Sequence, residues 1–176
     1  MKIYRLDFDV NNYKSIQLCD KVDGDFYQMF DGERLEKKWT IPNVCEYEED
    51  IDLLDGDAPG FIIPVLNKRA LDLLWPIIKG DVEVLPLNKN GELLYGINVL
   101  SIIDAVDYEL STYRTYRDGK RIMSFKKISF KEDKVHDTNI FKVIDLKRGD
   151  IYVSEEFYNA VIKNNLKGFK MIKIYG

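Results

Sequence analysis

Hydrophobic and polar residues alternate along much of the chain, and this pattern predicts a fold rich in β-strands. Near the start, Tyr4, Leu6 and Phe8 alternate with charged residues, as expected for a strand with one buried face. Two turns, Asn90-Gly91 and Asp118-Gly119, separate pairs of such segments and predict β-hairpins. The strands predicted in this way lie within residues 4–10, 15–18, 82–85, 93–95, 97–103, 113–117, 121–130, 140–143, 151–153 and 169–175.

Two other segments, about 67–79 and 155–165, have the spacing of apolar residues that is typical of helices. Asn67 and Ser154 stand at their starts as N-caps. Pro76 lies inside the first segment and predicts a kink or two short helical pieces, because proline lacks the N–H that a helix interior needs. Antiparallel hairpins with two main helices predict an α+β fold in a single domain, residues 1–176.

Length and composition fit a folded domain outside the membrane. A chain of 176 residues, 45% hydrophobic and 32% charged, buries a core without help from disulfides or metal. The apolar run at residues 60–66, interrupted by Pro64, is far shorter than the ~20 residues of a membrane helix. Charged residues interrupt the N-terminus before a secretion signal forms. We therefore expect a cytoplasmic protein, with Cys19 and Cys45 as reduced thiols.

The net charge of −4 conceals an acidic half and a basic half. Residues 1–60 carry 7 basic and 15 acidic side chains, and residues 61–176 carry 19 basic and 15 acidic ones. Seven of the acids crowd into one stretch of twelve residues: Glu46, Glu48, Glu49, Asp50, Asp52, Asp55 and Asp57. Such a stretch is either a solvated loop or a negative patch that binds a basic partner.

The basic excess is concentrated in the second predicted hairpin, residues 113–134, where cations and aromatic residues interleave. This combination is found in proteins that bind single-stranded nucleic acid, which makes a nucleic-acid-binding or regulatory module the alternative function. Aromatic residues on strands also form core contacts, and lysines protect exposed sheet edges. The acidic charge of the whole chain argues against nucleic acid as its partner.

Known catalytic and cofactor motifs are missing from the sequence. There is no G-x-G-x-x-G, no phosphate-binding loop and no H-E-x-x-H, and the cysteine spacing matches no zinc site. The stretch that starts at Asp7 imitates a calcium loop, but Asn12 and Leu18 stand where glycine and glutamate are needed. His136 lies in a polar stretch and is expected to be an exposed loop residue. We expect no enzyme activity, no metal and no cofactor.

Short pieces over nearly the whole chain match, in their order and spacing, one family of proteins. The pieces are Phe30-Asp31-Gly32-Glu33 with Leu35 and Trp39 before Pro42, Pro64-Val65-Leu66 with Ala70-Leu71, residues 81–87, Asn98-Val99-Leu100 with Asp104-Ala105, Ile140-Phe141-Lys142, and residues 153–157 before Gly168-Phe169. In these pieces the chain resembles the eleventh family of bacterial immunity proteins of polymorphic toxin systems, formerly a domain of unknown function.

The resemblance implies a cytoplasmic protein that binds and neutralises a cognate toxin domain without catalysis. It brings no active-site motif, and the matched residues are turn formers, caps and apolar positions; Trp39 is expected in the core. Inhibitors of nuclease toxins often present a negative surface, since a nuclease has a basic groove. The acidic stretch 46–57 is therefore the candidate contact with the toxin. Oligomeric state is left open.

Overall fold

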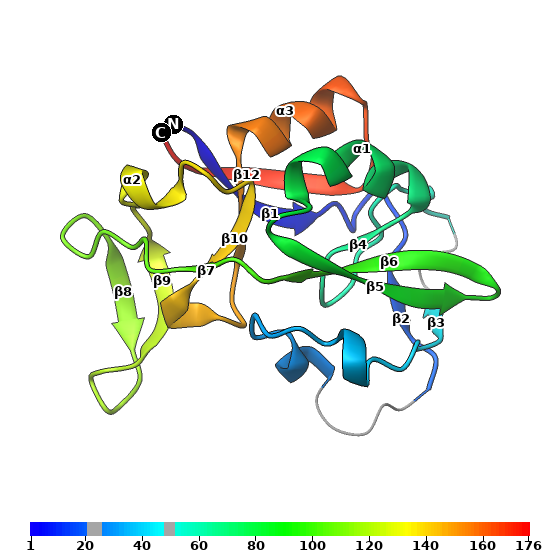
Figure 1. Cartoon of the computed structure of the whole chain (residues 1–176), viewed down its shortest axis with the longest axis horizontal. Coiled ribbons are helices and arrows are strands. Elements are labelled where there is room, and N and C mark those ends of the chain that lie inside the picture. The colour runs from blue at the N-terminus through cyan, green and yellow to red at the C-terminus, as the bar shows by residue number, and fades with distance from the viewer. Residues whose placement is uncertain (21–25, 48–51) are drawn as a thin grey trace.

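The computed structural model describes residues 1–20, 26–47 and 52–176, which form an α+β fold and confirm the predicted class (Figure 1). The strands are β1 (Ile3–Phe8), β2 (Ile16–Leu18), β3 (Val44–Glu46), β4 (Val65–Leu66), β5 (Val82–Lys89), β6 (Glu92–Val99), β7 (Ile102–Ile103), β8 (Thr112–Thr115), β9 (Ile122–Lys127), β10 (Ile140–Val143), β11 (Ile151–Ser154) and β12 (Phe169–Tyr175). The α-helices are α1 (Lys68–Ile78), α2 (Glu132–Val135) and α3 (Glu155–Lys163), with 3₁₀ turns η1 (Phe26–Met29), η2 (Glu36–Lys38) and η4 (Ile144–Leu146).

The largest sheet has five strands in the order β12-β1-β11-β10-β7. β1 pairs antiparallel with both β11 and β12, and β7 joins β10 in parallel. Tyr4 and Leu6 of β1 are buried in a core cluster that also holds residues of α1 and α3. The Tyr4 ring stacks on Tyr158 of α3, with 4.3 Å between ring centroids. The alternation at the start of the chain thus marks the face of the sheet that the helices cover.

β5 and β6 form the predicted hairpin, and β4 adds on the other side of β6. Asn90 and Gly91 have the positive φ angles, 52° and 91°, that a tight hairpin turn requires. β6 runs unbroken through Gly96, where the sequence predicted two separate strands. A side chain at Gly96 would lie 3.1 Å from the side chains of Ile63 and Leu87, so this glycine allows close packing and does not end the strand.

Both main helices lie on one side of the molecule and begin at the predicted caps. The Asn67 side chain accepts a hydrogen bond from Ala70 N (2.8 Å), and Ser154 Oγ accepts one from Phe157 N (3.1 Å). α1 is one helix through Pro76, so of the two predicted alternatives, a kink or two short pieces, the second was wrong. Pro76 removes only the bond to the carbonyl of Asp72, an exposed residue, and water can satisfy that carbonyl.

The segment around η1 and η2 packs on the other face of β5 and β6. Trp39 is half-buried there against Phe26 and Phe30, and its Nε1 donates to Pro86 O (2.9 Å). Buried polar groups hold the segment to the sheets. Lys142 Nζ of β10 donates to Phe30 O (2.8 Å), and the Glu83 carboxylate of β5 accepts from the backbone N–H of residue 35 (2.7 Å).

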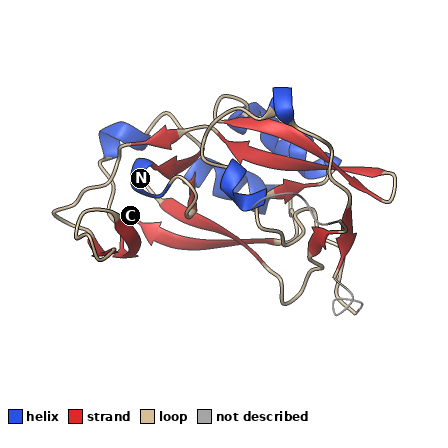
Figure 2. Cartoon of the chain, turned by 90° about the horizontal axis from the view of Figure 1, so that it is seen from below, coloured by secondary structure: helices blue, strands red, loops and turns tan. Residues whose placement is uncertain are grey.

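The two small sheets lie at opposite ends of the molecule. β2 and β3 pair antiparallel at one end, and β8 and β9 form the second predicted hairpin at the other (Figures 1 and 2). The chain termini lie close together, nearer the β8–β9 end. The fold therefore separates the acidic stretch, which follows β3, from the basic hairpin.

Candidate partner-binding site

The acidic stretch runs beside the start of β2. Lys14 N donates to Leu54 O (2.9 Å) and Leu54 N donates to Asn12 O (3.2 Å), so residues 52–56 lie along residues 12–14. Of the seven predicted contact acids, Glu48, Glu49 and Asp50 lie outside the described residues. The structure therefore places four of them: Glu46, Asp52, Asp55 and Asp57.

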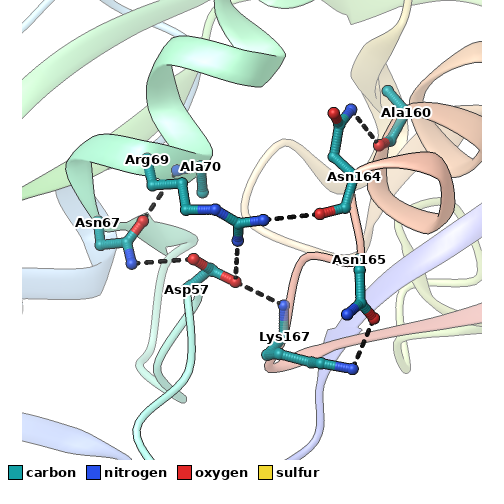
Figure 3. A network of polar contacts seen from close by, with 8 residues as sticks. All are labelled: Asp57, Asn67, Arg69, Ala70, Ala160, Asn164, Asn165 and Lys167. Carbon is teal, nitrogen blue, oxygen red and sulfur yellow. Dashed lines mark hydrogen bonds and ion pairs between the residues drawn. The ribbon is translucent and has the colours of Figure 1, made fainter.

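Asp57 is buried, with 7% of its surface exposed, and links three parts of the chain (Figure 3). Its carboxylate accepts from Arg69 Nη1 (2.8 Å), Asn67 Nδ2 (3.0 Å) and the backbone N of Lys167 (2.8 Å). Arg69 Nη2 in turn donates a hydrogen bond to Asn164 O at the end of α3 (2.7 Å). Burial acts to raise the pKa of Asp57, but these hydrogen bonds outweigh it and lower the pKa below its ordinary value. Asp57 thus fixes α1, α3 and the approach to β12.

Glu46 and Asp55 meet around one lysine. Lys14 Nζ lies 3.3 Å from a carboxylate oxygen of each, and Lys89 Nζ lies 2.6 Å from the other oxygen of Glu46. The hydrogen bond from Lys89 is the main cause of a lowered Glu46 pKa. The structure therefore brings Glu46 and Asp55 together and sends Asp57 to a separate network. Asp52 is exposed and forms no ion pair with another described residue.

An apolar groove of about 580 Å³ lies next to this stretch. Val10, Tyr47 and Ile62 line it, and each is roughly half exposed. Exposed apolar side chains beside charged ones are common in protein interfaces. Composition and spacing gave no sign of the groove, because its walls come from three separate segments.

The β8–β9 hairpin carries exposed cations at the other end of the molecule. The cations in residues 114–134 are Arg114, Arg117, Lys120, Arg121, Lys126, Lys127, Lys131 and Lys134. Within the described ranges, only Arg121 and Lys134 of this set form ion pairs, with Asp118 and Asp133. The basic end thus keeps most of its charge free, whereas most of the described acids at the other end are paired.

The aromatic residues of this hairpin pack on one another. Tyr113 lies edge-on to Phe125 and to Tyr108, each with 6.0 Å between ring centroids. The guanidinium of Arg121 lies over the ring of Tyr116, 5.1 Å from its centroid. The interpretation as a cross-strand pair is therefore confirmed for Tyr113 and Phe125. Tyr108, Tyr113 and Tyr116 are also about two-fifths exposed.

The remaining candidate groups are isolated. His136 is exposed, with Nε2 2.9 Å from Asp137. Cys19, directly after β2, and Cys45 of β3 are free thiols. A hydrogen bond with Cys45 raises the pKa of Cys19 to about 11. In residues 1–20, 26–47 and 52–176, no group of three or more His, Cys, Asp or Glu side chains is arranged to hold a metal ion. None of the described helices has the length and apolar character to span a membrane.

Comparison with known protein families shows to which family the chain belongs. Residues 84–176, more than half of the 176, match the immunity protein family Imm11. The chain belongs to the Imm11 immunity protein family. The match confirms the resemblance described above, and it runs from β5 through the basic hairpin to β12. No curated protein matches the chain. Membership of the Imm11 family indicates a toxin-neutralising immunity function. The acidic stretch 46–57 lies outside the matched residues 84–176.

Proposed function

We propose that this protein, acting as a single domain over residues 1–176, binds a cognate toxin domain and blocks it without catalysis. The toxin would belong to a bacterial polymorphic or contact-dependent system, and the inhibitor would act in the cytoplasm. The observation that carries the proposal is the match of residues 84–176 to the Imm11 immunity proteins. A protein of this kind works by occupying the toxin surface, so its function depends on shape and charge at its own surface.

In this proposal the acidic stretch contributes a charged contact to a basic region of the toxin. Asp52 is exposed and has no ion pair with any residue in the described part of the chain. The Asp55 side chain is 79% exposed, although it lies near Lys14. Glu48, Glu49 and Asp50 add charge between Glu46 and Asp52 in the sequence. Asp57 supports the stretch from within and is not a contact, because its carboxylate already accepts three hydrogen bonds.

The function is tested by searching the genes next to this one for a toxin domain and co-expressing that domain with this protein. Cells that make the toxin domain should die, and cells that also make this protein should survive. Purified protein and toxin domain should form a stable complex, measured by size-exclusion chromatography and calorimetry. Death of cells that contain ample folded protein, together with no complex in vitro, would refute the immunity function.

The acidic contact is tested by replacing Asp50, Asp52 and Asp55 together with Asn. Association with the toxin should slow several-fold at low ionic strength and much less at high salt, because complementary charges chiefly accelerate encounter. A matched control neutralises three acids elsewhere: Glu33→Gln, Glu109→Gln and Glu156→Gln, each exposed. Equal rates for both triple variants would show that the stretch is only a solvated loop.

A further inference from the structure

A second groove lies at the basic end, between β9 and the residues around η4. Its volume is about 920 Å³, large enough for several side chains of a partner. Met123 and Ile144 form part of its floor and are 46% and 47% exposed. Lys120, Arg121, Lys147 and Arg148 are exposed and line it. Exposed apolar side chains next to exposed cations are a combination that protein interfaces often present.

The acids of this groove are already engaged by the protein itself. Asp31 lies 3.4 Å from Arg148, and both carboxylate oxygens of Asp145 accept from the Tyr108 hydroxyl (2.9 and 2.8 Å). Asp150 lies 3.9 Å from Arg5. By contrast, Lys120 and Lys147 form no ion pair with any residue of the described ranges. The Tyr108 hydroxyl is neutral, so Asp145 keeps its charge; with four cations against three acids in its lining, the groove is positive by one charge.

We propose that this groove binds an acidic segment of the toxin that carries at least one large apolar side chain. The apolar side chain would cover Met123 and Ile144, and its acidic neighbours would pair with Lys120 and Lys147. This inference rests on the proposed function, since it takes the segment to belong to the toxin. It adds a second contact of opposite sign to the acidic stretch, at the opposite end of the molecule (Figure 1).

The packing of the hairpin favours a protein segment over single-stranded nucleic acid. Nucleic acid of this kind is held by bases that stack on open aromatic faces. Here Arg121 covers one face of Tyr116, and Tyr113 packs edge-on against Phe125. Cations and flexible apolar side chains such as Met123 suit a protein contact, where Met and Arg are enriched.

The test reverses the two free cations, Lys120→Glu with Lys147→Glu, in the full chain. The matched control, Lys37→Glu with Lys38→Glu, makes the same change in net charge at exposed lysines of η2. Association with the purified toxin domain is followed by biolayer interferometry over a range of salt concentrations. The groove variant should associate at least about tenfold more slowly than wild type at low ionic strength, and the control within about twofold. Thermal unfolding of each variant verifies folding.

A second variant, Met123→Ser, tests the floor of the groove separately from its charge. It should accelerate dissociation several-fold and leave association nearly unchanged, because apolar contacts act after encounter. Wild-type rates for both groove variants would overturn this inference and leave the proposed function intact. Failure of the wild-type protein to bind the toxin would overturn both. An oligo-thymidine that binds the wild type but not the charge-reversed variant, with toxin binding unchanged, would assign the groove to nucleic acid.

Discussion

Asp57 shows how one carboxylate of an acidic stretch can have a structural function. It connects the start of α1 to the end of α3 and to the approach to β12. Asp57→Asn should destabilise the protein by about 1–3 kcal/mol, since a charged acceptor of three hydrogen bonds is lost in a buried site. The exposed Asp55→Asn should change stability by less than about 0.5 kcal/mol. Urea unfolding of both variants measures the difference, and equal stability would contradict the network in Figure 3.

Asp57 also makes the stability of the protein depend on pH. Hydrogen bonds lower the pKa of Asp57, so its contribution is complete above the unfolded value of about 3.9 and is lost as the pH falls through the folded value. The stability gap between wild type and Asp57→Asn should therefore shrink as the pH is lowered from about 6 to about 3. A gap that stays constant over this range would show that folding does not lower the pKa of Asp57.

Lys142 should make stability rise with pH in the alkaline range, as Asp57 does in the acid range. Burial lowers its pKa to about 8, whereas an unfolded lysine titrates near 10.4. Between these values the unfolded chain binds the extra proton, so the stability that depends on Lys142 rises with pH. Relative to Lys142→Met, the wild type should gain up to about 3 kcal/mol between about pH 8 and about pH 10.5. Parallel pH profiles in urea unfolding would disprove this, and the exposed Lys126→Met serves as the control.

At the scale of single elements, the N-cap of α3 offers a direct test of how the sequence sets helix boundaries. Ser154→Ala removes the acceptor for Phe157 N and should cost about 1 kcal/mol, within a range of 0.5–2. Ser154→Thr keeps an acceptor oxygen and should recover most of the loss. Unfolding by urea, followed by circular dichroism, compares the two variants. Equal losses would mean that the cap bond does not contribute.

The elements that could be predicted from sequence are those fixed by local chemistry. The turn at Asn90-Gly91 and the cap at Ser154 depend on residues within a few positions, and both occur as expected. The sequence predicted separate strands on either side of Gly96. The reason for a glycine within the strand is the close approach of Ile63 to its backbone, a long-range contact that the local pattern does not show. Pro76 was given too much weight, because its exposed location in the fold was not visible in the pattern. Long-range packing decided both outcomes.

The candidate sites were predictable only in part for the same reason. The sequence showed where acids and bases concentrate, but not which of them the fold would pair. Lys14 and Lys89 meet Glu46 across 32 and 43 positions of the chain, so no local pattern indicates their ion pairs. Lys120 and Lys147 are likewise far apart in sequence and line the same groove.

At the scale of the whole molecule, variants at the two charged ends can separate the effect of local contacts with the toxin from the effect of the protein's net charge. Neutralising Asp50, Asp52 and Asp55 makes the protein less acidic, and the Lys120→Glu, Lys147→Glu pair makes it more acidic. If net charge alone guided the toxin, the two sets of changes would affect association in opposite directions. If each end meets its own complementary region of the toxin, both sets should slow association and weaken binding.

Because the two ends share no residues and lie far apart in the fold, their effects should also be independent (Figures 1 and 2). The protein that carries both sets of changes should lose binding free energy equal to the sum of the separate losses, within about 0.5 kcal/mol. Calorimetry with the toxin domain measures the four affinities of this cycle. A combined loss no larger than that of one set would place the whole contact at one end of the molecule.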